Sequence, residues 1–112
     1  MINKPYKIAE ITEEYIKFTN GFVITYFHDQ DWCEYNYAQF DALDDIARDA
    51  TFVGNLDFEE VPGYGFKFGN KPCNMHFVPC YSVQNGYYSS GVDIFLNGYE
   101  MLSVLCEEKV YD

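Results

Sequence analysis

The 112-residue sequence has few basic residues and no long apolar run. Seven Lys and Arg stand against eighteen Asp and Glu, which gives a formal net charge of −11. A field of this sign repels phosphate groups, so we expect no direct binding to nucleic acid or to anionic membranes. No stretch approaches the ~18 consecutive apolar residues of a membrane-spanning helix, so we expect no membrane span.

The sequence also lacks an N-terminal secretory signal, because residues 1–15 contain no apolar core segment. We therefore expect a cytoplasmic protein. The cysteines are widely spaced and form no C-x-x-C pair: Cys33, Cys73, Cys80 and Cys106. In a reducing compartment such cysteines are expected to remain free thiols.

Motifs typical of enzymes are absent too. There is no phosphate-binding glycine loop, no G-x-S-x-G and no H-E-x-x-H. Carboxylates are abundant, but abundance without a spacing pattern predicts no active site. We therefore expect a protein that is not an enzyme and that needs no cofactor.

Aromatic residues are plentiful: 11 Tyr, 10 Phe and 1 Trp. This content excludes a disordered chain, and the length suits one domain, residues 1–112, with its own core. No internal repeat, low-complexity tract or linker divides the sequence.

Turn dipeptides predict most of the strands. Asn20-Gly21 separates the β-forming runs EYIKFT and FVITYF, so residues 14–27 are predicted to form a hairpin with a type I′ turn. Further strands are expected at residues 64–68, 75–83, 87–96 and 99–106. The last three would form a C-terminal meander, and Pro79 indicates an edge position or a bulge.

Residues 41–50, DALDDIARDA, are predicted to form the single helix. Its apolar residues follow the i, i+3, i+4, i+7 spacing of one buried stripe: Leu43, Ile46, Ala47 and Ala50. Asp41 is the expected N-cap, and Asp44 is expected to pair with Arg48. The predicted fold class is therefore α+β: a mostly antiparallel sheet of five or six strands (hairpin plus C-terminal meander) with one short helix.

The acids are concentrated in residues 29–60, where ten acids and one base, Arg48, give a charge of −9. Four of these acids lie on the predicted helix: Asp41, Asp44, Asp45 and Asp49. Tyr35 and Tyr37 precede the helix, and tyrosine is common at protein interfaces. We interpret these six residues as a candidate docking surface for a basic protein, although the same charge also favours solubility.

The stretch 28-HDQDWCE-34 is a candidate metal or small-ligand site, because imidazole, thiolate and carboxylate all bind zinc. Its candidate ligands are His28, Asp31, Cys33 and Glu34. The paired spacing of structural zinc sites is missing, since each soft ligand stands alone. The alternative is an acidic turn at a strand end, with His28 hydrogen-bonded to a neighbouring acid.

Two motifs resemble a family of small proteins of unknown function from bacteriophages and bacteria. They are the H-x-Q-D-x-C-E pattern at residues 28–34 and the N-G-Y-Y-S pattern at residues 85–89. The resemblance extends over roughly residues 12–96. Trp32 stands where the family tends to have a second cysteine. The resemblance implies a phage or mobile element, and hence the cytoplasm of a host cell, but no activity.

Three functions fit these observations. The first is a small non-enzymatic inhibitor that binds a basic surface of a host nucleic-acid-handling or defence protein, as a DNA mimic or an anti-CRISPR-like protein would. The second is a metal- or small-ligand-binding module centred on residues 28–34. The third is a virion or assembly component, for which a stable oligomer would be the signature.

Overall fold

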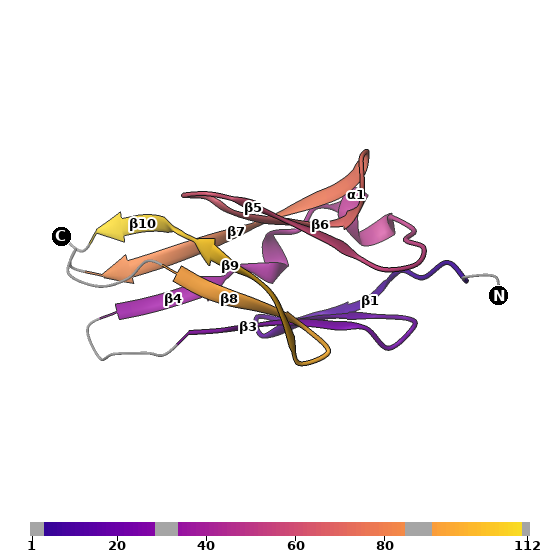
Figure 1. Cartoon of the computed structure of the whole chain (residues 1–112), viewed down its shortest axis with the longest axis horizontal. Coiled ribbons are helices and arrows are strands. Elements are labelled where there is room, and N and C mark those ends of the chain that lie inside the picture. Colours follow the sequence, from indigo (N-terminus) through magenta and orange to yellow (C-terminus); the bar gives the residue numbers. More distant parts are fainter. Residues whose placement is uncertain (1–3, 29–33, 85–90, 111–112) are drawn as a thin grey trace.

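The predicted hairpin is present, and it lies within one of two β-sheets (Figure 1). The computed structural model describes residues 4–28, 34–84 and 91–110. Strands β2 (Tyr15–Phe18) and β3 (Val23–Phe27) are antiparallel, and the N–H of Phe18 donates to the carbonyl of Phe22, which leaves a loop of three residues, 19–21. Gly21 has a φ of 95°, and its N–H donates to the carbonyl of Phe18. A three-residue connection of this kind contains a type I turn, so the predicted type I′ turn is wrong here.

The first sheet has five strands in the order β1-β2-β3-β8-β9. The strands not yet bounded are β1 (Ile8–Ile11), β8 (Gly91–Leu96) and β9 (Tyr99–Leu105). Asn97 and Gly98 join β8 to β9 with φ angles of 52° and 85°. Two positive φ angles in a two-residue loop are the mark of a type I′ turn.

The second sheet is organised around β7 (Asn74–Gln84). Its first half pairs with β6 (Gly65–Asn70), which pairs in turn with β5 (Asp57–Val61). Its second half pairs with β4 (Glu34–Ala38) and, in parallel, with β10 (Glu107–Val110).

Pro79 lies where the pairing between β4 and β7 ends. Its carbonyl accepts a hydrogen bond from the N–H of Gln39, and the last β4 pair is Ala38 with Cys80. Proline has no N–H to return a bond, so β4 cannot continue along β7. Pro79 therefore ends the pairing with β4 on one side, while on its other side it pairs with Gly65 of β6.

The predicted α+β class with a mostly antiparallel sheet is confirmed, but the predicted sheet organisation is wrong in two respects. The strands form two sheets of five rather than one sheet of five or six. The C-terminal meander is limited to β8 and β9, because β7 lies in the other sheet and β8 pairs with β3. Four strands had not been predicted: β1, β4, β5 and β10.

The predicted helix over residues 41–50 is divided into η1 (Phe40–Ala42) and α1 (Asp45–Asp49). Leu43 is extended between them. The N-cap of α1 is Asp44 rather than Asp41, because the Asp44 side chain accepts a hydrogen bond from the N–H of Ala47. The predicted stripe fails at Ile46, which is 74% exposed, because Leu43 lies outside the helix and so shares no helical face with Ile46. No helix within the described ranges is long and apolar enough to cross a membrane.

The core lies between the two sheets, which are stacked in Figure 1 with β1 and β3 in one layer and β5, β6 and β7 in the other. At one end it contains the buried rings of Tyr6, Phe18, Phe52 and Phe68, which we call the closed aromatic core. Neighbouring rings lie 5.7 to 6.0 Å apart. Burying one such side chain contributes roughly 1.5–3 kcal/mol.

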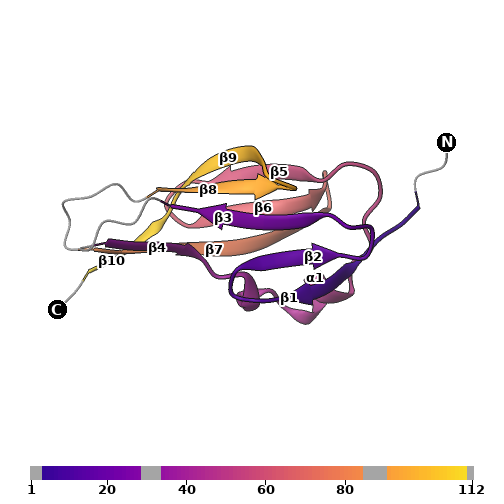
Figure 2. The ribbon, with the colours of Figure 1, turned by 90° about the horizontal axis from the view of Figure 1, so that it is seen from below.

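The two sheets approach each other along both sides. On one side, the N–H of Leu105 in β9 donates to the Glu60 carboxylate of β5 (2.8 Å). On the other, β3 and β4 run side by side in Figure 2, and the Asn36 amide donates to the carbonyl of Gly91 (3.0 Å). The junction of β3 and β4 is where a pocket forms.

Candidate functional site

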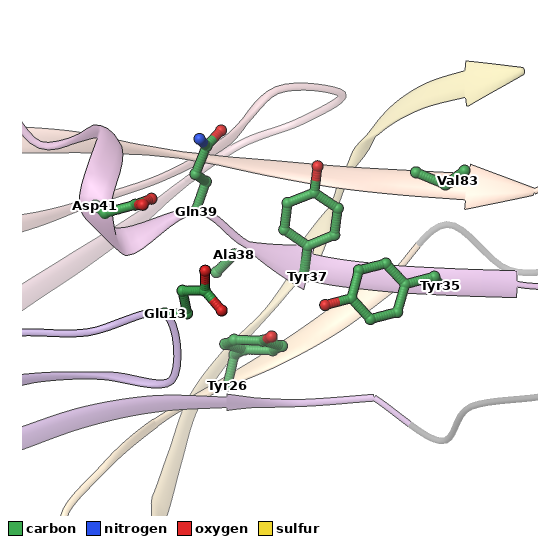
Figure 3. Close-up of a pocket in the computed structure, with 8 residues that line it drawn as sticks. All are labelled: Glu13, Tyr26, Tyr35, Tyr37, Ala38, Gln39, Asp41 and Val83. Atoms are coloured by element: carbon green, nitrogen blue, oxygen red, sulfur yellow. The ribbon is translucent and has the colours of Figure 1, made fainter.

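A pocket of about 320 Å³ opens beside β3 and β4 (Figure 3). The turn between β1 and β2 and the short helix η1 complete its walls. We call it the tyrosine pocket, and it is lined by Glu13, Tyr26, Tyr35, Tyr37, Ala38, Gln39, Asp41 and Val83. Pockets that bind whole small molecules measure about 300–1,000 Å³. This pocket is at the lower end of that range, so it suits a small group such as a single side chain.

The strand β4 provides two of the three rings. Successive side chains of a strand point to opposite faces, and here Asn36 and Ala38 are buried while Tyr35 and Tyr37 face outward. The rings of Tyr35 and Tyr37 lie 5.0 Å apart. Tyr37 also lies 5.6 Å from Tyr81, its partner on β7. The cross-strand pair therefore holds these rings in place on the surface.

The third ring, Tyr26, enters the pocket from the other sheet. It packs edge-on against Phe40 of η1, with ring centres 5.7 Å apart. Burial, and then the neighbouring Tyr35, to which its side chain is hydrogen-bonded, raise the pKa of Tyr26 to about 12. Tyr26 is therefore a neutral, well-fixed ring at any physiological pH.

Two exposed carboxylates complete the pocket. Glu13 lies in the turn before β2, where the Thr12 hydroxyl accepts hydrogen bonds from the N–H groups of Glu14 and Tyr15. Asp41 follows β4 on η1. In Figure 3 the Glu13 carboxylate lies in the space between Tyr26 and Asp41. None of the lining residues that the structure describes is a Lys or an Arg.

The predicted metal or ligand site at residues 28–34 is described only in part. His28 is half-buried, and its Nδ1 lies 3.3 Å from the amide Nδ2 of Asn36. Asp31 and Cys33 lie outside the described residues, and of Glu34 only the backbone, at the start of β4, is described. Within the described ranges, no three His, Cys, Asp or Glu residues are grouped so that they could hold a metal ion.

Asn36 joins His28 to a buried polar network under β4. Asn36 and Ser82 are both fully buried. The Ser82 hydroxyl donates to Asn36 Oδ1 (2.5 Å), while the Asn36 amide reaches the carbonyl of Gly91. Buried polar groups need such partners. In this network His28 contacts the side-chain amide of Asn36 on the neighbouring strand β4.

The predicted docking residues are divided between two places. Tyr35, Tyr37 and Asp41 meet in the tyrosine pocket. Asp45 and Asp49 are exposed on α1. Asp44 is exposed too, but it serves as the N-cap of α1.

Sequence reasoning missed Glu13 and Tyr26 as members of the site. No local pattern marks them, because their approach to β4 depends on the packing of one sheet against the other.

No protein-family model, curated protein or solved structure matches the chain.

Proposed function

We propose that this is a non-enzymatic binding protein that docks on a basic surface of another protein. The observation that carries the proposal is the combination of aromatic rings and an exposed carboxylate at one place, where the exposed Tyr35, the half-buried Tyr37 and Asp41 share a pocket. The acidic helix α1, with Asp45 and Asp49, follows η1 directly along the chain. Aromatic rings supply contact area, and the acids supply attraction to a basic partner.

The charge of this region is available to a partner. The single base among residues 40–50, Arg48, is directed to the backbone: its guanidinium donates to the carbonyls of Leu43 (3.0 Å) and Asp41 (3.2 Å). The sequence predicted a pair between Arg48 and Asp44, but the Asp44 carboxylate accepts from the N–H of Ala47 instead. The exposed acids Asp41, Asp45 and Asp49 outnumber this one base, so the local charge is negative.

The class of partner follows from charge complementarity. Proteins that bind nucleic acid carry clustered Lys and Arg, because phosphate neutralisation dominates their affinity. An acidic surface with a net charge of −11 behind it competes for such a cluster. We propose a nucleic-acid-handling or defence protein of a host cell as the partner, and inhibition of its nucleic-acid binding as the outcome. The phage context rests on the motif resemblance alone.

The test is affinity capture from a nuclease-treated host lysate with three baits of defined charge. One bait is the native protein, and another carries Asp41→Asn, Asp45→Asn and Asp49→Asn. The third is a matched control with Glu59→Gln, Glu100→Gln and Glu107→Gln, three acids that are also exposed. Asp44 is kept in every bait because it caps α1.

We expect one basic protein to bind the native and control baits, to be lost from the Asn bait, and to elute as salt rises. Duplex DNA should displace it. Equal capture by the Asn bait, or a captured protein that ignores DNA, would contradict the proposal.

A further inference from the structure

The tyrosine pocket has the composition of a site for one organic cation. Aromatic rings attract a cation that lies within ~6 Å of the ring centre, and here Tyr26, Tyr35 and Tyr37 line one space. Glu13 and Asp41 add two carboxylates to the same space. Rings and carboxylates together favour a positive charge and disfavour an anionic ligand.

The geometry distinguishes between two kinds of cation. A guanidinium is planar, so it stacks on a ring face and also donates paired hydrogen bonds to carboxylates. An ammonium is a compact, strongly hydrated charge that gains less from a ring. Because the tyrosine pocket offers ring faces and two carboxylates in one small volume of about 320 Å³, it matches the guanidinium better.

The occupant has to come from another molecule. The only Arg of the chain, Arg48, already donates to the carbonyls of Leu43 and Asp41. None of the described lining residues is basic.

We infer that the tyrosine pocket receives an arginine side chain of the partner protein, stacked on Tyr35 and Tyr37 and paired with Glu13 and Asp41. This inference rests on the proposed function and refines it, because it names the group that the partner inserts. It makes the tyrosine pocket the specific part of the interface, and the acids of α1 the long-range attraction.

The experiment uses N-acetyl-arginine amide as the probe, so that no partner is needed. The ring resonances of Tyr26, Tyr35 and Tyr37 are followed by NMR during the titration. We expect saturable shifts with a Kd on the order of millimolar, about tenfold weaker binding of N-acetyl-lysine amide, and no saturation with the uncharged N-acetyl-citrulline amide.

Two variants with matched controls test the residues. Glu13→Gln with Asp41→Asn should weaken binding of the arginine probe at least about tenfold. Glu100→Gln with Glu107→Gln, an equal change in charge at two exposed acids outside the pocket, should leave it unchanged. Tyr35→Ala should abolish saturation, whereas Tyr99→Ala, at a tyrosine that is 77% exposed elsewhere, should not. All four substituted acids are exposed, so the charge variants are expected to fold.

Equal binding of the citrulline probe, or equal effects of the two charge variants, would overturn the inference. The failures of the two proposals are distinguishable. If the arginine probe does not bind while capture still depends on Asp41, Asp45 and Asp49, only the pocket inference falls. If the arginine probe binds and capture does not depend on those acids, only the proposed function falls.

Discussion

Two aromatic clusters among the described residues, the closed aromatic core and the tyrosine pocket, differ in their burial and in their neighbours. In the closed aromatic core, Phe18, Phe52 and Phe68 are at most 1% exposed, and the one hydroxyl, that of Tyr6, donates to the carbonyl of Gly54 (2.6 Å). In the tyrosine pocket, Tyr35 is 49% exposed, and carboxylates replace the apolar neighbours. The polar atom of the first cluster is satisfied within the chain, whereas the second cluster leaves a ring and carboxylates exposed to solvent.

The difference teaches that aromatic content alone does not separate stability from function. Both clusters bring rings to within 5 to 6 Å of each other. They differ in whether polar groups are bonded within the core and in how far water reaches the rings. Substitutions should therefore affect unfolding at the closed aromatic core and binding at the tyrosine pocket.

The largest effect is expected at Phe52. Phe52→Ala removes a fully buried ring that contacts Tyr6, Phe18 and Phe68, so it should lower the free energy of unfolding by about 3–5 kcal/mol. Tyr37→Ala should lower it by only about 1 kcal/mol, because it removes a cross-strand surface pair. Urea unfolding measures both. Similar losses at the two positions would remove the distinction between the clusters.

A smaller effect is expected under the tyrosine pocket, at the buried pair Asn36 and Ser82. Asn36→Ala should cost about 1–3 kcal/mol, because it removes the buried bonds that Asn36 makes with Ser82 and Gly91. Adding Ser82→Ala should then cost less than it does alone, since its bond to Asn36 is already lost. A double-mutant cycle in urea measures this coupling, and strict additivity would show that the pair is not coupled.

The pH dependence of stability should come in part from the closed aromatic core. His76 contacts Phe52 and Phe68, and burial there lowers its pKa, an effect that the nearby Asp44 opposes. The unfolded chain then binds the proton more readily, so the free energy of unfolding should fall as the solution goes from about pH 7 to pH 5. His76→Gln should flatten this slope. An unchanged slope in the His76 variant would refute the assignment.

The last prediction, with the smallest effect on stability, concerns the chemical reactivity of the cysteine thiols. Cys73 is exposed, while Cys80 and Cys106 are buried. A hydrogen bond to Cys106, and then burial, raise the pKa of Cys80 strongly, so its thiol stays protonated. In a Cys33→Ala background, iodoacetamide should modify Cys73 at least about 100-fold faster than Cys80 or Cys106. Peptide mapping measures the three rates. Equal rates would show that Cys80 and Cys106 are as accessible to iodoacetamide as Cys73.

The sequence predicted those elements that depend on local signals. Asn20-Gly21 predicted the position of the β2–β3 hairpin, and Asn97-Gly98 lies at the turn between β8 and β9. Strand β4 was missed because its centre is a polar residue, Asn36, whose burial depends on Ser82 and Gly91 far along the chain. For the same reason the sequence suggested Tyr35, Tyr37 and Asp41 but not Glu13 or Tyr26, which reach the pocket only when the sheets pack.

The strand orders also have a consequence for how the chain folds during synthesis. Strand β3 lies between β2 and β8, so its second partner exists only after β8 has been synthesised. Ile24 of β3 pairs with Leu96 of β8, 72 positions later in the sequence. Ribosomes add about 5–20 residues per second, so the 64 residues from Phe27 to Gly91 take roughly 3–13 s. During that interval the β2–β3 hairpin lacks the partner that β8 provides along β3. The chain should therefore fold slowly and depend on chaperones while it is made.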